Sequence, residues 1–307
     1  MKIIFKPKKT KNYIVTLAIG KKFFNHWKNY SLPSWKLYCK KNDIGIICFD
    51  KELISKEHKK WKKIIWQQLL IGSKLENLNV ENVCYVDTDI LINPLSPNIF
   101  KNYDKKKFLI SSNINNLPYN LNIVRKRVAF FRNKFLNKKY PLDSGLFANL
   151  NQLYKFSNLK PQKDEICSGV YVYNIRNHSK LLQKWFYLYD SKVISMTSGG
   201  IQIHLGYHII KSKKYKFLGY KYQAYWMYEM ALNYPFLYYM KDKKVIKECI
   251  ESCLMNNYFL HFAGAWSDGE MWKRKILNSK KINLYKKLYN YYVKKVSGKP
   301  VGYISQK

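Results

Sequence analysis

Three short apolar runs near the start of the chain restrict the fold most strongly. They read YIVTLAIG (residues 13–20), IGIICFD (44–50) and NVCYVDTDILI (82–92). The segments between them have the mixed apolar and polar spacing of helices that pack on one face. An order of strand, helix, strand, helix and strand favours a parallel sheet with right-handed crossovers. We therefore predict an α/β chain with a mixed, mainly parallel central sheet flanked by helices.

Later segments extend this pattern. Residues 57–71 are predicted to form an amphipathic helix, whereas residues 101–140 are basic and asparagine-rich and are predicted to be irregular rather than sheet. EICSGVYVYNI (165–175) is a further strand, and Ser179 is expected to cap the helix after it. The predicted inward positions are Trp61, Ile64, Ile65, Gln68 and Leu69 in the first helix, and Leu181, Leu182, Trp185 and Phe186 in the second.

No linker rich in Gly, Ser or Pro divides the chain. We predict a single domain over residues 1–280 and a basic helical C-terminal extension over residues 281–307. Six cysteines show neither metal-site nor disulfide spacing, which fits a reducing compartment. No apolar run reaches 18 residues, and the N-terminus lacks the pattern of a signal peptide. A cytoplasmic location is expected.

The formal charge of +37 raises the question of an anionic partner. Of 56 basic residues only five are Arg, and the lysines occur as scattered pairs. Recognition of nucleic acids by paired hydrogen bonds favours Arg, so no nucleic-acid partner is expected. A lysine-rich surface suits peripheral contact with an anionic membrane, which stays open as a second location.

Two aspartates, Asp87 and Asp89, interrupt the third apolar run. In extended backbone, side chains two residues apart face the same side, and ligands of open α/β sheets bind beyond the carboxyl ends of strands. Two carboxylates there need a cation or amide donors, and oxygen ligands without thiolates select hard ions such as Mg²⁺ or Mn²⁺. The alternative is that both aspartates cap the turn into INPLSP (92–97).

The context of this pair resembles a known family. VCYVDTDILINPLSPNIF (83–100) is similar to the D-x-D signature of glycosyltransferases with the GT-A fold, particularly the family 8-like transferases that use nucleotide-diphospho-sugars. Four further elements resemble the family's in the same order. They are residues 16–53 (first strand, helix and second strand), WKKIIWQQLL (61–70, a helix with a W-x-K element), CSGVYVYNIRNHSKLLQKWF (167–186, the N-[AS]-G-V strand and its helix) and HFAGAW (261–266, a late His-x-x-Gly element).

This resemblance implies a metal site. Asp87, Asp89 and His261 would bind Mn²⁺ or Mg²⁺, which neutralises the charge on the departing diphosphate. Mn²⁺ suits a site that combines oxygen ligands with one imidazole. For His261, which lies between Leu260 and Phe262, the alternative is an ordinary hydrogen-bonded core histidine.

The resemblance also implies donor contacts. Ala18 and Gly20 would lie near the base and ribose, and Lys63 near the rest of the donor. Asp87, Thr88 and Gly264 would approach the nucleotide, since glycine permits close backbone contact with phosphate.

Gln202 and Asp89 would be the catalytic residues. Gln202 lies in SGGIQIHLGYHI (198–209), which resembles an Asp-Gln-x-x-Leu-Asn segment near the sugar. A neutral amide is a poor nucleophile, so front-face attack through an oxocarbenium-like state is favoured over a covalent intermediate. The alternative is that Gln202 caps its helix.

The late element departs from the family pattern. The family continues with Lys-Pro-Trp, whereas this chain has Ser267 and Asp268 where Lys and Pro would fall. Lys273 or Arg274 could take the role of the missing lysine.

Several other side chains have two readings. Ser168 and Gly169 resemble the strand that lines the acceptor side, although LDSGLFANL (142–150) contains a second Ser-Gly pair. His204 and His208 have a metal-compatible spacing, but without a third ligand nearby a packed or solvent-facing side of the helix is favoured. Tyr225 and Trp226 could stack on an acceptor sugar or belong to the core.

These features predict a metal-dependent glycosyltransferase that moves a hexose from a nucleotide-diphosphate sugar, UDP-linked, to a hydroxyl group of a glycan, glycolipid or glycoprotein. Retention of configuration is implied by the resemblance alone. One alternative is a sugar-nucleotide nucleotidyltransferase, for which AIGKKFF (18–24) is a poor match to the expected Gly-rich loop. Another is a non-catalytic basic protein that binds membrane or nucleic acid, which would leave Asp87 and Asp89 without a role.

Overall fold

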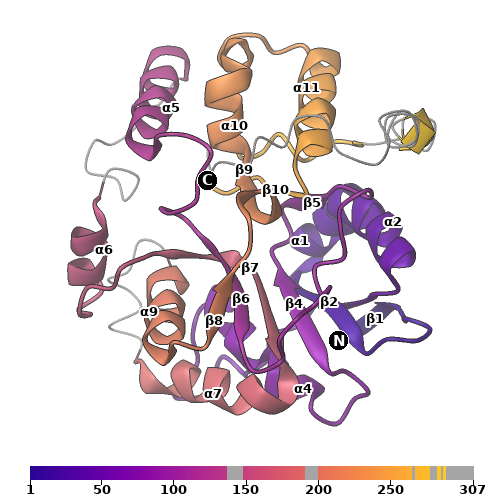
Figure 1. Ribbon diagram of the computed structural model, residues 1–307, viewed down its shortest axis with the longest axis vertical. Helices are drawn as coiled ribbons and strands as arrows, with labels where there is room; N and C mark the ends of the chain where they lie inside the picture. Colours follow the sequence, from indigo (N-terminus) through magenta and orange to yellow (C-terminus); the bar gives the residue numbers. More distant parts are fainter. Residues whose placement is uncertain (137–147, 191–199, 265–266, 277–281, 285, 288–307) are drawn as a thin grey trace.

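A large mixed sheet forms the centre of the molecule (Figure 1). The computed structural model describes residues 1–136, 148–190, 200–264, 267–276, 282–284 and 286–287. In chain order, the strands of this sheet are β1 Lys2–Phe5, β2 Asn12–Leu17, β3 Gly45–Phe49, β4 Asn82–Val86, β6 Phe108–Ser112, β7 Ile166–Asn174 and β8 Tyr215–Phe217. Their order across the sheet is β1-β3-β2-β4-β7-β6-β8.

The strand directions confirm the predicted α/β class. β2 pairs parallel with β3 and β4, as the first three apolar runs predict. β7 runs antiparallel to both β4 and β6, β6 runs parallel to β8, and β1 runs antiparallel to β3. Five of the seven strands therefore point in one direction, and the sheet is mixed but mainly parallel.

A small three-stranded sheet contains β5 Ile90–Ile92, β10 Phe259–His261 and β9 Ala224–Tyr225 in that order. The third apolar run is therefore divided, with Asn82–Val86 in the large sheet as β4 and Ile90–Ile92 in the small sheet as β5. Asp87 is the last residue held to the large sheet, because its N–H donates to the Gly169 carbonyl at 2.9 Å. A turn closed by the Ile90 N–H and the Asp87 carbonyl, at 3.2 Å, then redirects the chain into the small sheet.

Helices cover both faces of the large sheet (Figure 1). The apolar core on one face contains Trp66, Leu182 and Phe186, and the core on the other face contains Trp27 and Trp35. A third core lies between the small sheet and the helices above it. The helices are α1 Lys21–His26, α2 Leu32–Asn42, α3 Ile64–Gln67, α4 Ile71–Leu75, α5 Leu121–Phe135, α6 Leu150–Phe156, α7 Ile175–Leu188, α9 Gln202–Ser212, α10 Trp226–Asn233 and α11 Lys243–Asn256, with the π-helix η1 Trp27–Ser31 and the 3₁₀ turns η2 Gln68–Leu70, η3 Tyr220–Gln223 and η4 Pro235–Tyr238.

The helix predicted over residues 57–71 is wrong in its start, and its inward face is confirmed in part: Gln68 and Leu69 are buried and Trp61 packs against the core, whereas the prediction is wrong for Ile64 and Ile65. Helical structure begins only at Ile64, and Ile64 and Ile65 are 37% and 39% exposed whereas Trp66 is fully buried. Upstream, the chain is held in turns, and the Trp61 indole N–H donates to the Glu52 carboxylate at 2.5 Å. This contact holds Trp61 outside the helix.

The prediction that residues 101–140 are irregular is also wrong, because β6 and α5 lie within them. The apolar part of β6 is short and follows three lysines, yet it is buried because β7 and β8 pair with it on both sides. The side chain of Asn120 caps α5 by accepting the N–H groups of Asn122 and Ile123.

Ser179 is not a helix cap. It lies inside α7, which begins at Ile175 with Asn174 as its N-cap. Asn174 accepts the N–H of Asn177 at 3.1 Å, while the Ser179 hydroxyl donates to Glu76. The predicted inward face of this helix is otherwise confirmed, since Leu182, Trp185 and Phe186 are buried and Leu181 packs against them.

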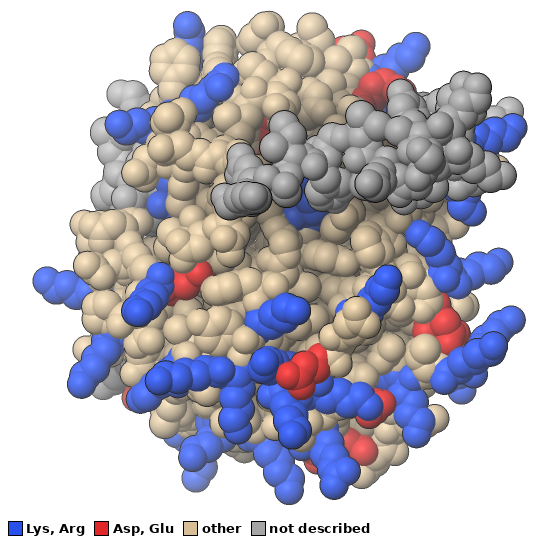
Figure 2. Space-filling model, in the orientation of Figure 1, with Lys and Arg blue, Asp and Glu red and all other residues tan. Residues whose placement is uncertain are grey.

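The predicted C-terminal extension, residues 281–307, lies almost entirely outside the described residues, so it and the boundary at 280 stay predictions. Among the described residues, none of the helices combines the length and the apolar character that crossing a bilayer requires. Figure 2 shows that Lys and Arg side chains are dense on the lower half of one face, where Figure 1 places α4 and α7. On α7, Arg176, Lys180 and Lys184 are exposed.

His204 gives the fold a pH-dependent stability. It is 1% exposed in α9, and both ring nitrogens lack a hydrogen-bond partner within the described part of the chain. Its ring centroid lies 5.1 Å from that of Trp66 and 4.4 Å from that of Tyr189. Burial, and then the neighbouring His208, lower the pKa of His204 to about 4. The imidazole is therefore neutral in the fold and titrates near pH 6.5 once unfolded.

We predict that acidification from pH 7 to pH 5 destabilises the protein through this group. The unfolded state binds a proton in this window and the folded state does not, so the free energy of unfolding falls by about 1–2 kcal/mol. His204→Phe, which keeps a ring in the aromatic cluster, should lose correspondingly less stability over the same interval. Urea unfolding of both proteins at pH 7 and pH 5 measures this difference. Equal losses in the two proteins would contradict the prediction.

Candidate functional site

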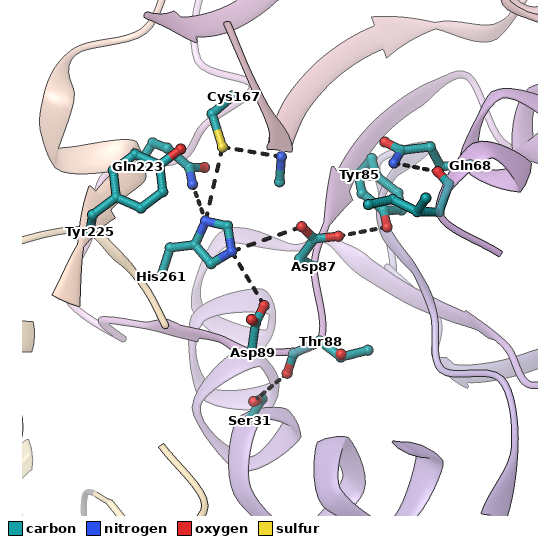
Figure 3. Close-up of polar contacts among 12 residues, drawn as sticks. Ser31, Gln68, Tyr85, Asp87, Thr88, Asp89, Cys167, Gln223, Tyr225 and His261 are labelled. Atoms are coloured by element: carbon teal, nitrogen blue, oxygen red, sulfur yellow. Dashed lines mark hydrogen bonds and ion pairs between the residues drawn. The ribbon is translucent and has the colours of Figure 1, made fainter. Parts of the chain in front are cut away.

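Asp87, Asp89 and His261 come together at the junction of the two sheets (Figure 3). His261 Nε2 lies 3.9 Å from Asp87 Oδ2 and 3.4 Å from Asp89 Oδ1. One ligand atom from each residue lies within 4.8 Å of the others, and this is the one such group of three found among the described residues. The predicted trio therefore forms a cluster, while its role as a metal site stays a prediction.

The backbone fixes this arrangement. Asp87 and Asp89 follow β4, whose carboxyl end lies beside that of β2 in the parallel part of the sheet. His261 ends β10 and lies opposite Ile90 of β5 in an antiparallel register. The Phe262 N–H donates to the Asp89 carbonyl at 3.1 Å, so the histidine and the second aspartate cannot slide past one another.

Gly169 provides the space beside the cluster. It lies in β7, opposite the end of β4, and its carbonyl accepts the Asp87 N–H. A Cβ at this position would lie 2.6 Å from Cε1 of His261 and 3.0 Å from Oδ2 of Asp87, closer than real Cβ contacts allow. Glycine is thus required here by the imidazole and carboxylate, and not by its backbone conformation.

Burial and neighbouring charges shift the pKa values within the cluster. The pKa of Asp87 is raised to about 6 by burial and by the negative charge of Asp89. Burial by itself lowers the pKa of His261, but the Asp89 carboxylate reverses the effect and raises it well above the usual value. Tyr85 donates its hydroxyl to Asp87 Oδ1 at 2.7 Å, which leaves Oδ2 directed toward His261.

Gln223 contacts His261 on the side of the ring that faces away from the carboxylates. Its side-chain amide contacts Nδ1, on the far side of the ring from the carboxylates, while Gln223 Oε1 is buried without a hydrogen-bond partner in the described residues. Turning this amide by 180° would satisfy Oε1 with the Nδ1 proton and leave the Nε2 lone pair free toward Asp87 and Asp89. Two carboxylates and one such imidazole fit Mn²⁺ or Mg²⁺.

The residues predicted to contact the base and ribose lie at the end of β2. Ala18 is fully buried, and its N–H donates to the Phe49 carbonyl at 2.9 Å, which makes it part of the core. Gly20 has φ +89° with open space on its Cβ side, immediately before α1. Thr88 is half-buried in the turn between the aspartates, and its carbonyl accepts the Ser31 hydroxyl at 2.7 Å.

The two remaining donor predictions have different surroundings. Gly264 has φ +101° and open space on its Cβ side, three residues after His261. Lys63 is exposed, whereas the preceding Lys62 is 2% exposed with Nζ 4.1 Å from the centre of the Phe186 ring. Burial lowers the pKa of Lys62 to about 8. The roles of Gly264 and Lys63 toward a donor stay predictions.

Gln202 is the first residue of α9, and its side-chain amide donates to the Glu165 carboxylate. The N-cap is Ile201 and no side chain caps this helix, so the capping alternative for Gln202 is wrong. Glu165 is 6% exposed and also accepts from Asn113 Nδ2 at 3.2 Å. Asn113 in turn accepts the Tyr225 hydroxyl at 2.8 Å.

This hydrogen-bonded chain leads back to the cluster. The ring of Tyr225 stacks on that of His261 at 5.4 Å between centroids and an angle of 24°. Sequence reasoning missed Glu165, Asn113 and Gln223. The contacts of these three residues are visible only in the structure. Tyr85 was missed as well, but it could have been found because it lies two residues before Asp87 on the same strand face.

The departure from the family's Lys-Pro-Trp places Asp268 in a buried ion pair. Asp268 lies where the family has Pro, and both it and Arg132 are almost fully buried with 2.9 Å between Arg132 Nη2 and Asp268 Oδ2. Lys273 pairs with Glu270 on the surface. Arg274 keeps Nε and Nη1 buried without a hydrogen-bond partner among the described residues. Neither basic residue is placed at the cluster by a contact, so a replacement for the lysine stays a prediction.

Several residues could have either a functional role or a packing role. Trp226 and Tyr225 are 0% and 8% exposed and belong to the core. His204 is packed among aromatic rings, and the Tyr189 hydroxyl lies 2.7 Å from Nε2 of His208, so neither histidine joins a metal cluster in the described part of the chain. The second Ser-Gly pair, within residues 142–150, lies outside the described residues.

Comparisons with known proteins give likeness of structure and not of sequence. No protein-family model and no curated protein matches the chain. Among solved structures, a glycosyltransferase involved in the glycosylation of the major capsid of PBCV-1 matches 85% of this chain and 99% of its own, with a TM-score of 0.48 and 11% identity. The galactosyltransferase LgtC matches 91% and 95% (0.46, 10%), and GlyE of Streptococcus pneumoniae matches 92% and 64% (0.45, 11%).

Proposed function

We propose that this protein is a divalent-metal-dependent glycosyltransferase that moves a hexose from a UDP-sugar to a hydroxyl group of a glycan acceptor. The observation that supports this most directly is the cluster of Asp87, Asp89 and His261 beside Gly169. Both aspartate side chains are 27% exposed, so the carboxylates can be reached from solvent by a diphosphate. The two carboxylates repel one another at this spacing, as the raised pKa of Asp87 indicates, and a cation with its diphosphate would neutralise them.

The bound ion would be held by Asp87, Asp89 and His261 and would neutralise the charge that develops on the departing diphosphate. The protein's part is to preorganise these ligands. Tyr85 holds one oxygen of Asp87, Gln223 holds the far nitrogen of His261, and the stacked ring of Tyr225 fixes the plane of the imidazole. Such supporting contacts set the orientation and basicity of the ligands.

Gln202 would act on the sugar. An ionised Glu165 can only accept hydrogen bonds, so it binds the NH₂ of the Gln202 amide and turns the amide oxygen away from itself. We propose that this oxygen faces the anomeric carbon and stabilises its positive charge during front-face transfer with retention. The amide is a weak nucleophile, which makes a charge-stabilising role more reasonable than a covalent one.

Substitution of this pair provides a test. Gln202→Ala is expected to lower kcat about 100-fold with little change in the donor KM, because the interaction is made in the transition state. Glu165→Gln removes the fixed direction of the hydrogen bond and should lower kcat about tenfold. Initial rates over a range of donor concentrations measure both effects, with Gln183→Ala on α7 as the control. A normal kcat for Gln202→Ala would refute its role.

A donor screen tests the proposed function itself. Release of free nucleoside diphosphate is measured across UDP-, GDP- and ADP-sugars with Mn²⁺. We expect release from a UDP-sugar, its loss on chelation, and its return when Mn²⁺ is added. Release of pyrophosphate from a nucleoside triphosphate and a sugar phosphate would instead identify a nucleotidyltransferase. If none of the donors is turned over in the presence of metal, the alternative of a non-catalytic basic protein is favoured.

We further propose that the lysine-rich side of the molecule rests on an anionic membrane. The support is the density of basic side chains around α4 and α7 in Figure 2, together with the formal charge of +37. Binding to liposomes that contain anionic lipid is expected to weaken at least tenfold between 50 mM and about 500 mM salt, because surface charges are screened. Sedimentation with liposomes measures this. Equal binding to neutral liposomes would contradict an electrostatic contact.

A further inference from the structure

A cavity with a volume of about 910 Å³ lies near the small sheet. The parallel strands β9 and β10 run from this cavity to the cluster of Asp87, Asp89 and His261. Their carboxyl ends carry Tyr225 and His261, whereas Tyr222 and Tyr258, just before the two strands begin, line the cavity. Tyr258 precedes His261 by three residues, which is about 10 Å along an extended strand. The cavity is therefore separate from the cluster but close to it.

The lining combines aromatic rings with amide groups. Four tyrosines and four asparagines contribute to it, alongside Glu229 and Lys221. The rings of Tyr222 and Tyr258 meet edge to face at 4.9 Å between centroids. On the helices, Asn233 and Asn256 are exposed. Amides offer both donors and acceptors, and a tyrosine offers an apolar ring face with a polar tip.

Glu229 limits the kind of ligand that fits. Its carboxylate accepts the Tyr220 hydroxyl at 2.8 Å and the Asn233 amide at 3.0 Å, and the Cys253 thiol donates to it as well. Glu229 and Lys221 place one charge of each sign in the wall, so the lining favours a neutral ligand over a phosphate or another anion. Apolar ligands are disfavoured as well, because Leu117, Pro118 and Cys253 are the main apolar side chains beside the tyrosine rings. A neutral molecule with many hydroxyl groups and apolar C–H faces satisfies rings, amides and carboxylate together.

We propose that this cavity binds a neutral oligosaccharide. It would hold the body of the acceptor glycan about 10 Å from the cluster of Asp87, Asp89 and His261, a role that rests on the proposed glycosyltransferase function. The binding itself does not need a donor or a metal ion, because none of the cluster residues lines the cavity. The cavity can therefore be tested apart from catalysis.

The experiment measures binding of lactose, maltotriose, chitotriose and α-1,6-mannotriose by saturation-transfer NMR and calorimetry, with a chelator present and no nucleotide. Asn256→Trp places a bulky ring at the exposed end of α11, in the wall of the cavity. Asn151→Trp makes the same change at an exposed position on α6, which does not line the cavity. Thermal unfolding of each variant verifies that both are folded.

At least one of these sugars is expected to bind, and Asn256→Trp should weaken that binding at least tenfold while Asn151→Trp and Asp89→Ala leave it unchanged. Failure of all four sugars to bind would overturn the proposal, as would normal binding by folded Asn256→Trp. If the donor screen fails but the sugar binds with this pattern, the proposed function falls and the binding site remains. If the donor screen succeeds and no sugar binds, the proposed function remains and the proposed binding site falls.

Discussion

Replacement of Asp89 with alanine is expected to reduce release of nucleoside diphosphate at least about 1000-fold, while the fold stays intact. Asp89 Oδ1 lies 3.4 Å from His261 Nε2, and loss of this ligand removes several kcal/mol of transition-state charge stabilisation. The fold should tolerate the change because the Phe262 hydrogen bond uses the backbone carbonyl of residue 89, and because removal of one charge relieves repulsion on Asp87.

The activity assay is paired with a metal-binding assay. Thermal unfolding with and without Mn²⁺ should show stabilisation of the wild-type protein, about 2.7 kcal/mol at 100 times the dissociation constant, and none of Asp89→Ala. Glu57→Ala removes the same charge from an exposed loop and should change neither result. Undiminished turnover by Asp89→Ala would eliminate the metal assignment, and with it the central support for the proposed function.

The fold was predictable where burial is local and continuous. The runs that became β2, β3, β4 and β7 are mostly apolar and almost entirely buried, so their strand character could be predicted from the runs themselves. β6 was missed because three apolar residues that follow three lysines are buried only by pairing with strands on both sides. The start of the helix near Ile64 was missed for a similar reason, since the distant Glu52 holds Trp61 outside it.

The candidate site was predictable to the extent that its residues resemble a motif. Asp87, Asp89 and His261 could be named, and the structure brings them together, although they face one another across a turn and a second sheet rather than along one strand. Glu165 and Gln223 could not be named, because their partners lie 37 and 38 residues away in the chain. No local spacing records a contact of that kind.

Gly169→Ala is the second large effect that the geometry predicts. Gly169 does not have a positive φ, so alanine fits its backbone and would by itself favour the folded state slightly. The added methyl would nevertheless lie 2.6 Å from His261 Cε1 and 3.0 Å from His261 Nδ1. Gln223 and the Tyr225 ring limit how far the imidazole can shift. The steric clash with the added methyl group is therefore relieved only if His261 rotates away from Asp87 and Asp89. We expect Mn²⁺ affinity and turnover each to fall at least about 100-fold, with a loss of about 1–3 kcal/mol of stability.

Gly72→Ala separates the steric cost from the effect on the site. Its added methyl would lie 2.6 Å from Cβ of Ser179, the same closeness between carbon atoms, at the contact of α4 with α7 rather than at the cluster. It should lose similar stability yet bind Mn²⁺ as the wild-type protein does once folded, as measured by electron paramagnetic resonance of the free ion. Equal Mn²⁺ affinity in Gly169→Ala and Gly72→Ala would mean that the imidazole is not a ligand, because displacing it would then have no consequence for the metal.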